Sequence, residues 1–346
     1  MIAIDGSYEE GGGQILRTAT ALSVLTNKAI TITNIRAKRP NPGLRAQHLT
    51  TIKILETISD AETEGLEIGS KKIRFCPNKI RGGTYTFDVG TAGSITLIFQ
   101  AIMLASFNLS ETLNLKIKGG TDVRWSPSWD YFAKVFVPIV SNIGVKTDLE
   151  LKRRGFYPAG GGEAHVTIYP SSNYVPLIIN EQQEYDKVDG NIVISKLPDH
   201  ISTRIKHSIV KFFLSNSIDA KLSVERDDSS LSEGVAVTLW SNSGKTIIGS
   251  AMLGEKGLPS EKLGGKCATT LLQEMSSGAS LDVHATDQLL AYLAFVAVEN
   301  NDISIFLTRE ISSHAQTTMW LIEKFLPVVF EVKKIENLFE VTVKPS

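Results

Sequence analysis

Residues 86–119 read TFDVGTAGSITLIFQAIMLASFNLSETLNLKIKG and contain the basic structural unit of the chain. The stretch begins with a short apolar strand that ends at Asp88, and a loop of small and polar residues follows. An apolar segment of helix length comes next, and the alternation of Leu113, Leu115 and Ile117 predicts a second strand. The order strand, helix, strand is typical of proteins with mixed α/β architecture.

The same pattern occurs twice more, in residues 2–35 (IAIDGSYEEGGGQILRTATALSVLTNKAITITNI) and 280–310 (SLDVHATDQLLAYLAFVAVENNDISIFLTRE). These copies also begin with a predicted strand that ends in Asp, at Asp5 and Asp282. Each copy continues into a further predicted helix, in residues 41–59, 126–144 and 312–330. The sequence therefore predicts an α/β fold of α+β repeats, built from β-α-β-α-β-β units whose sheets are covered by helices on one side.

Residues 181–278 interrupt this repetition. Their pattern predicts strands and helices in a different order, as in GNIVISKLP followed by HISTRIKHSIVKFFLSN. We interpret them as a small inserted α/β domain, which leaves 1–180 and 279–346 as the repeat-built catalytic domain. A degenerate fourth repeat is the alternative.

The composition excludes several classes of protein. With 42% hydrophobic and 21% charged residues among 346, the chain is expected to fold around a sizeable core. The net charge of −1 gives no general attraction to nucleic acid, so an anion site has to be local. Cys76 and Cys267 are too few for a disulfide framework or a structural zinc site. No signal peptide or apolar run of about 20 residues is present, which predicts a cytoplasmic protein without a membrane partner.

One glycine-rich stretch and one basic stretch could bind phosphate. EEGGGQILR places glycines ahead of a helix, whose N-terminus offers N–H groups to anions, although a tight turn is the simpler explanation for glycine alone. NIRAKRPNPGLRAQHL carries Arg36, Arg39 and Arg45, which could hold phosphate bidentately or form a solvated basic turn. SGKT at 243–246 lacks the first glycine of a phosphate loop and is predicted to be a hairpin turn.

Histidine and tryptophan occur in three further motifs. His314 follows two serines at the start of a helix, where it could be a core histidine or a nucleophile towards phosphorus. In DVHATDQLL, His284 and Gln288 share a helix face and could contact a nucleotide or a metal. GGTDVRWSPSWDYF holds Trp125 and Trp129, which could stack on bases, although at least one is expected in the core.

Eight blocks, in order along nearly the whole chain, resemble the RNA 3'-terminal phosphate cyclase family. They are DGSYEEGGGQILRTATALSVLT, IRAKRPNPGLRAQHL, DVGTAGSITLIFQ, GGTDVRWSPSWDY, RRGFYPAGGG, GEKGLPSEKLG, DVHATDQLL and SSHAQTTMWLIEKFLP. The resemblance implies repeats like the C-terminal domain of translation initiation factor three, with a smaller α/β insert. It also implies that ATP and a divalent cation, Mg²⁺ or Mn²⁺, are used to convert an RNA 3'-terminal phosphate into a 2',3'-cyclic phosphodiester.

The resemblance further implies roles for individual residues. His314 would be the nucleophile that accepts AMP, and Glu10 with Asp287 would form the metal site. Positions expected to face the phosphates or the RNA end are Arg17, Arg36, Arg39 and Gln47. Positions expected to contact the nucleotide are Gln100, His284, Ala285, Thr286, Asp287 and Gln288. His284 stands where the family often has an aromatic residue.

Two other functions are consistent with such a fold. A non-catalytic, cyclase-like ribosome-assembly protein would keep the repeats but is expected to lack the histidine. An enolpyruvyl transferase shares a related repeat fold, but its chemistry needs no histidine nucleophile and its motif order is absent. The presence of His314 therefore favours the cyclase.

Overall fold

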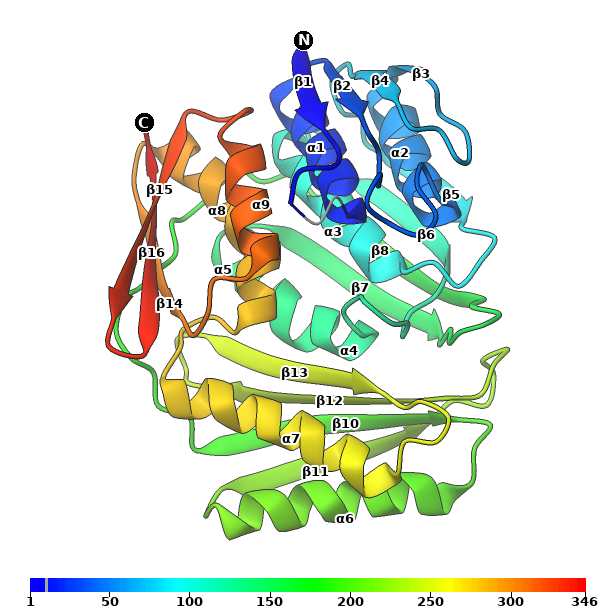
Figure 1. The fold of residues 1–346 in the computed structure, drawn as a ribbon, viewed down its shortest axis with the longest axis vertical. Helices are drawn as coiled ribbons and strands as arrows, with labels where there is room; N and C mark the ends of the chain where they lie inside the picture. Colours follow the sequence, from blue (N-terminus) through cyan, green and yellow to red (C-terminus); the bar gives the residue numbers. More distant parts are fainter. Residues whose placement is uncertain (10–11) are drawn as a thin grey trace.

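The computed structural model describes residues 1–9 and 12–346, which form four four-stranded sheets with helices packed against them (Figure 1). The predicted mixed α/β class is confirmed. Within the described residues, none of the helices combines the length and apolar character needed to span a bilayer.

The first unit has the strand order β1-β2-β4-β3, in which β1 and β2 are parallel and the other neighbours antiparallel. Alternating buried residues such as Ile30 and Ile32 place one face of this sheet in the core. Its elements are β1 (Ile2–Asp5), α1 (Gly13–Thr26), β2 (Ile30–Thr33), α2 (Ala46–Ser59), β3 (Glu62–Glu64) and β4 (Ile73–Cys76).

The second unit repeats this arrangement with the order β5-β6-β8-β7. Its second helix is continuous from Trp129 to Asn142 but passes through a π-helical turn at Phe132–Phe136, a distortion often found at functional sites. The elements are β5 (Gly83–Asp88), α3 (Ile95–Ala105), β6 (Leu113–Gly119), α4 (Trp129–Tyr131), α5 (Val137–Asn142), β7 (Lys146–Arg153) and β8 (Gly162–Tyr169), with a 3₁₀ turn at Ser106–Asn108.

The third unit has the same order, β9-β14-β16-β15, but its first strand is not where the sequence predicts it. Residues 280–282 form no strand, because the N–H groups of Ser280 and Leu281 both bond to the carbonyl of Leu307 and Asp282 caps a helix. The edge position belongs to β9 (Ile178–Ile179), which pairs in parallel with β14. The other elements are α8 (Val283–Asn300), β14 (Ser304–Thr308), α9 (Ser313–Ile322), β15 (Val328–Ile335) and β16 (Leu338–Pro345).

A fourth sheet, which we call the β10–β13 unit (187–277), lies between β9 and α8 in the chain. Its order is β11-β10-β12-β13, so its first strand is internal, whereas the first strand of each other sheet is at an edge. The predicted turn at 243–246 joins β12 to β13 in a hairpin and is confirmed. The elements are β10 (Lys187–Ser195), α6 (Asp199–Ser215), β11 (Asp219–Arg226), β12 (Gly234–Asn242), β13 (Ile247–Leu253) and α7 (Ser260–Ser277).

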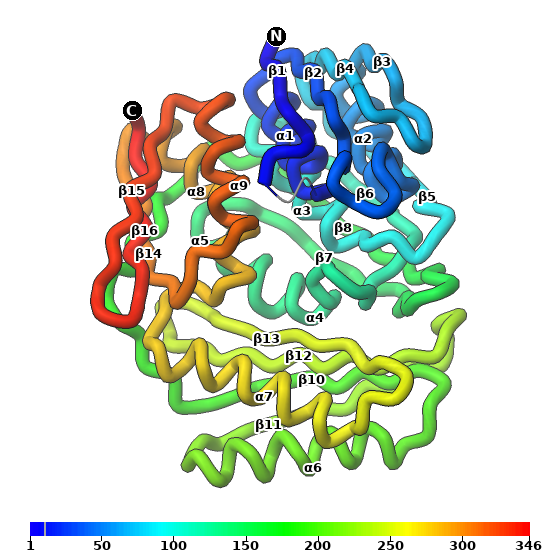
Figure 2. Tube along the Cα trace, viewed as in Figure 1, coloured from blue at the N-terminus to red at the C-terminus, as the bar shows by residue number. Residues whose placement is uncertain are grey.

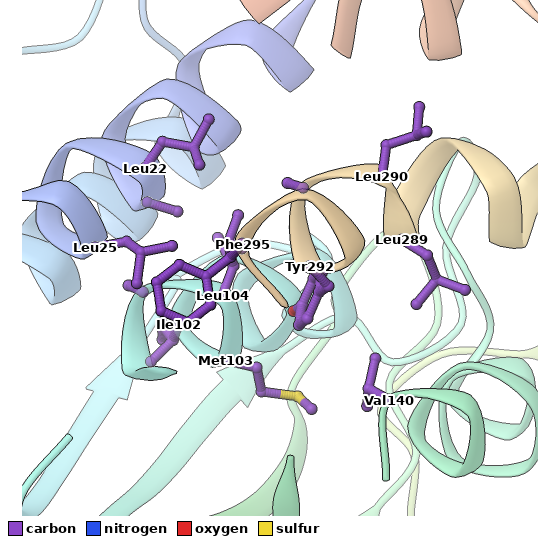
Figure 3. Close-up of a cluster of buried hydrophobic side chains, with 14 of the residues drawn as sticks. Leu22, Leu25, Ile102, Met103, Leu104, Val140, Leu289, Leu290, Tyr292 and Phe295 are labelled. Carbon is purple, nitrogen blue, oxygen red and sulfur yellow. The ribbon is translucent and has the colours of Figure 1, made fainter. Parts of the chain in front are cut away.

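The helices of the first three units share one core. Figure 3 shows Leu22 and Leu25 of α1, Leu104 of α3, and Tyr292 and Phe295 of α8 facing one another. Because α3 packs against helices as well as its own sheet, nearly its whole circumference is apolar and buried. The β10–β13 unit has a separate core, which includes Ile192, Phe213 and Leu271.

A buried arginine joins the β10–β13 unit to the second unit. In the backbone trace, β12 and β13 lie next to α4 (Figure 2). Arg154 is 1% exposed and forms ion pairs with Asp122 at 3.3 Å and Asp130 at 3.0 Å on one side. On the other side it pairs with Glu225 of β11 at 2.8 Å, and its backbone N–H donates to Asp227. Burial raises the pKa of Asp130, so that carboxylate depends on Arg154 to remain charged.

Replacing Arg154 with Ala is expected to lower the free energy of unfolding by about 3–5 kcal/mol, because it leaves buried carboxylates without a cation. Urea unfolding monitored by circular dichroism measures this change. The matched control is Arg204→Ala, which removes an arginine from the exposed pair with Glu261 and is expected to have a much smaller effect. Equal effects of the two substitutions would contradict a joining role for Arg154.

Candidate active site

A cavity of about 870 Å³ opens where the three units meet. Its wall includes Gln14 of α1, Gln100 of α3, Gln288 of α8 and His314 of α9. Strand β13 of the β10–β13 unit contributes Ala251. Residues from five separate elements therefore face one space of the size typical of ligand sites.

His314 lies in the first turn of α9, and Gln14 determines the orientation of its imidazole. The side-chain N–H₂ of Gln14 donates to the His314 carbonyl at 3.2 Å and to Thr318 Oγ1 at 2.5 Å. The Gln14 oxygen consequently faces His314 Nδ1 and accepts a hydrogen bond from it. In the tautomer that donates to Gln14, the ring proton is on Nδ1 and the lone pair is on Nε2.

The helix that carries His314 is linked to Asp287. Ser312 caps α9 by accepting from the N–H of Ala315 at 3.0 Å, and its hydroxyl donates to Asp287 Oδ1 at 2.5 Å. Burial raises the pKa of Asp287 to about 6, and the Ser312 hydrogen bond offsets part of that effect. His314 and Asp287 are therefore held on adjacent helix ends that face the same cavity.

The predicted nucleotide-contacting residues divide into two groups. Gln100, His284, Asp287 and Gln288 line the cavity, and the Gln100 amide donates to the Gln288 side chain. By contrast, the other two residues of this group do not line the cavity and are fully buried: Ala285 and Thr286. The Ala285 N–H donates to Asp282, and the Thr286 hydroxyl donates to Thr308 Oγ1 at 3.0 Å.

Among the described residues, four arginines of the first unit line the cavity, namely Arg17, Arg36, Arg39 and Arg45, and Arg124 of the second unit is a fifth. Arg36 is fixed by donating to the carbonyls of Asn41 and Gly43, at 2.7 and 3.1 Å. Burial lowers the pKa of Arg17 to about 10, whereas burial and the charges of Arg45 and Arg39 lower that of Arg36. Within residues 1–9 and 12–346, no carboxylate forms an ion pair with Arg17, Arg36 or Arg45, which makes the cavity locally cationic.

Gln47, the remaining predicted phosphate contact, has an unsatisfied donor. Its Nε2 is buried and has no hydrogen-bond partner among residues 1–9 and 12–346, and Gln47 lines both the main cavity and a smaller hollow beside Thr91 and Gly93. A buried amide without a partner is costly unless a ligand or water accepts from it. This donor is therefore suited to an anionic oxygen.

His48 is a site residue that the sequence analysis did not identify. It is 8% exposed, and its Nδ1 accepts from the N–H of Arg45 at 3.3 Å. Burial, followed by the charges of Arg17, Arg36 and Arg45, lowers its pKa to about 3, so the ring is neutral. Its Nε2 lies so close to Gly13 that a Cβ there would approach within 2.1 Å, which explains the requirement for glycine.

The predicted metal site is described in part, because Glu10 lies outside the described residues. No group of three or more His, Cys, Asp or Glu side chains suited to a metal was found in the part of the chain that the structure describes. Asp287 is the carboxylate of the described cavity wall. One or two carboxylates with phosphate oxygens and water are a normal ligand set for Mg²⁺, so the donors present are compatible with one.

The comparison with family models identifies the family of the chain. The model described as RNA 3'-terminal phosphate cyclase matches residues 8–332. The chain belongs to this family. Curated members with that name include proteins of Nitrosospira multiformis, 42% identical over 100% of this chain and 97% of the relative, and Methanosarcina mazei, 40% identical over 99% and 100%. A third, from Korarchaeum cryptofilum, is 42% identical over 96% of this chain and 94% of the relative.

In this cyclase-family chain, the sequence analysis missed Gln14 and His48 among the residues that line the cavity. Both lie inside motifs quoted for the resemblance, EEGGGQILR and NPGLRAQHL. Gln14 is three residues before Arg17 and therefore shares its helix face, which is a signal that could have found it. His48 likewise follows Arg45 by three residues and accepts from its N–H, so the same spacing could have found it, whereas its contact with the distant Gly13 could not be predicted.

His48 is expected to make stability depend on pH below neutrality. Its pKa is lower in the folded state (about 3) than in the unfolded chain (about 6.5), so the unfolded state binds the proton first and stability falls as the pH falls. Between pH 7 and pH 5 this group alone should remove about 2 kcal/mol, a loss that His48→Asn should lack.

Urea unfolding at several pH values measures this difference. The control is His207→Asn, which changes an exposed histidine on α6 and is expected to keep the wild-type pH dependence. If the free energy of unfolding changes with pH as steeply in His48→Asn as in the wild type, His48 is not held neutral in the folded state.

Proposed function

We propose that this chain uses ATP to convert an RNA 3'-terminal phosphate into a 2',3'-cyclic phosphodiester. In this reaction His314 would take AMP from ATP and pass it to the RNA phosphate. The observation that carries the proposal is the Gln14 contact, which leaves the nucleophilic lone pair on His314 Nε2 in a cavity lined by arginines. The curated relatives are named as cyclases, which favours this catalytic function over a non-catalytic assembly protein.

In the first step, His314 Nε2 attacks the α-phosphorus of ATP. A nitrogen–phosphorus bond forms, and the bond from that phosphorus to the pyrophosphate oxygen breaks. The Nδ1 proton stays on the ring, and Gln14 stabilises the positive charge that the ring acquires. The arginines would neutralise the departing pyrophosphate.

In the second step, an oxygen of the RNA 3'-phosphate attacks the phosphorus of the histidine-bound AMP. This forms an anhydride and returns His314 to its neutral state. The adjacent ribose 2'-hydroxyl then attacks the RNA phosphorus, AMP leaves, and the hydroxyl proton passes to water. Because nucleophile and phosphorus belong to one nucleotide, the last step gains from proximity and needs no strong dedicated base.

The other predicted residues receive roles from their positions. Arg17, Arg36, Arg39 and Gln47 would bind phosphate oxygens, since they line the cationic part of the cavity. Nucleotide contacts would come from Gln100, His284, Asp287 and Gln288, whereas Ala285 and Thr286 would fix the first turn of α8. Asp287 and Glu10 would hold Mg²⁺ or Mn²⁺, which supplies positive charge near the phosphates.

We also propose the domain division 1–180 with 279–346 against 181–278. The different strand order and the separate core of the β10–β13 unit support an inserted domain. The shared order of the other sheets is in keeping with repeats like the C-terminal domain of initiation factor three. The cytoplasmic location stays a prediction from the sequence.

Replacing His314 with Asn is expected to abolish AMP attachment while the protein stays folded, because Asn is tolerated in the first turn of a helix. Intact-protein mass spectrometry after incubation with ATP and magnesium, without RNA, measures the adduct. A gain of one AMP in both proteins would remove His314 from the mechanism. No adduct in either folded protein would instead favour the non-catalytic function.

Replacing Gln14 with Ala is expected to slow AMP attachment by about 10- to 100-fold, because the imidazole loses both its tautomer control and its orientation. The rate of mass gain measures the effect. Gln316→Ala is the matched control, since Gln316 is exposed on α9 and does not line the cavity. If Gln14→Ala lowers the melting temperature of the protein as well as the rate, Gln14 has a structural role and does not act on the imidazole.

A further inference from the structure

The loop between β6 and α4 exposes a tryptophan, whereas the tryptophan that begins α4 is buried. Trp129 is 5% exposed and packs edge-on against Phe99 in the core, as expected for one tryptophan of this motif. Trp125, four residues earlier, is 93% exposed and lines the cavity at its rim. Exposure of so large an apolar side chain at a ligand cavity suggests a binding surface.

The backbone at Trp125 is in a costly conformation. Its φ is +60°, in the left-handed region that bulky side chains rarely adopt. Strain of this kind persists where the surrounding structure imposes it, and it concentrates at ligand-binding sites. The residues around Trp125 therefore impose this backbone conformation on it.

The residues around Trp125 are firmly anchored. Asp122 accepts from the N–H of Trp129 at 3.3 Å, and the Ser126 hydroxyl donates to the Val123 carbonyl at 2.8 Å. Arg124 forms an ion pair at 2.8 Å with Glu255 of the β10–β13 unit. An exposed indole on an anchored loop loses little conformational freedom on binding, which favours its use as a rigid stacking surface.

We propose that Trp125 stacks on a base at the 3' end of the RNA, and this inference rests on the proposed function. The cavity that Trp125 borders also contains the arginine cluster, so an RNA phosphate held there would place bases at the rim. A flat aromatic surface beside cationic side chains is a common way to bind single-stranded nucleic acid of any sequence.

The position of Trp125 favours an RNA base over the adenine of ATP. The predicted nucleotide contacts Gln100 and Gln288 are hydrogen-bonded to each other on α3 and α8, and Gln100 is 8% exposed. Trp125 is instead almost wholly open to solvent, on a loop that leads towards the β10–β13 unit. A single-stranded RNA that enters the cavity from solvent would meet Trp125 before it reaches Gln100 and Gln288.

The test measures binding of fluorescently labelled, single-stranded RNA ending in a 3'-phosphate, by anisotropy and without ATP. Trp125→Ala is expected to weaken binding by about 5- to 150-fold, and Trp125→Phe by less, because a smaller ring still stacks. The matched control is Tyr157→Ala, since Tyr157 is 75% exposed but does not line the cavity and should leave binding as in the wild type.

Abasic RNAs identify the stacked nucleotide. If Trp125 stacks on a base, removing that base from the last or the second-last nucleotide should abolish the difference between the wild type and Trp125→Ala. A difference that persists with both abasic RNAs would overturn the proposal, as would unchanged binding by Trp125→Ala.

Self-adenylation by the same variants separates this inference from the proposed function. A Trp125→Ala loss in self-adenylation as large as its loss in RNA affinity would overturn RNA stacking and place the indole at the adenine. Failure of the wild type to form an AMP adduct, with RNA binding still dependent on Trp125, would overturn the His314 mechanism and support the stacking role.

Discussion

The carboxylate of Asp282 connects three parts of the chain beneath the cavity. Its Oδ1 accepts from the N–H of Ala285 at 2.9 Å, which caps α8, and from the Tyr131 hydroxyl of α4 at 2.7 Å. Its Oδ2 accepts from the N–H of Gly249 in β13 at 2.9 Å. Burial and the charge of Asp282 raise the pKa of Tyr131, so the phenol stays a donor. Because α8 carries Asp287 and Gln288, the geometry of this part of the cavity wall depends on that one buried group.

The Asp282 contacts are attractive, whereas the cluster of Arg17, Arg36 and Arg45 brings together groups that repel one another. Guanidinium groups that repel one another are held together by the backbone carbonyls that fix Arg36 and by the helix that carries Arg17. Such a cluster opposes folding until an anion enters, and a bound polyphosphate then converts the repulsion into affinity. Gln47, with its unsatisfied donor, fits the same interpretation. The site is thus arranged before ligand binding, which reduces the reorganisation that phosphoryl transfer requires.

The sequence could predict those parts of the molecule that rest on local patterns. Alternation at Leu113, Leu115 and Ile117 is a property of neighbouring residues, and β6 forms there. The edge strand β9 has two residues and a partner more than 100 positions away, so no pattern marks it. The same distinction holds in the site, where Gln14 meets His314 across 300 residues. Helix periodicity, however, could have separated His284, Asp287 and Gln288 from the buried Ala285 and Thr286.

Gly13, the first residue of α1, has a role that its sequence motif does not suggest. Glycine ahead of a helix commonly brings backbone N–H groups close to a phosphate. Here Gly13 instead makes room for the His48 ring, and any side chain at that position would displace it. His48 in turn accepts from the N–H of Arg45 at the start of α2, so its displacement would disturb the arginine loop. Gly13 therefore affects the arginine loop indirectly, through its contact with His48. The side chains of Arg17, Arg36 and Arg45, more than the backbone, make this cavity attractive to anions.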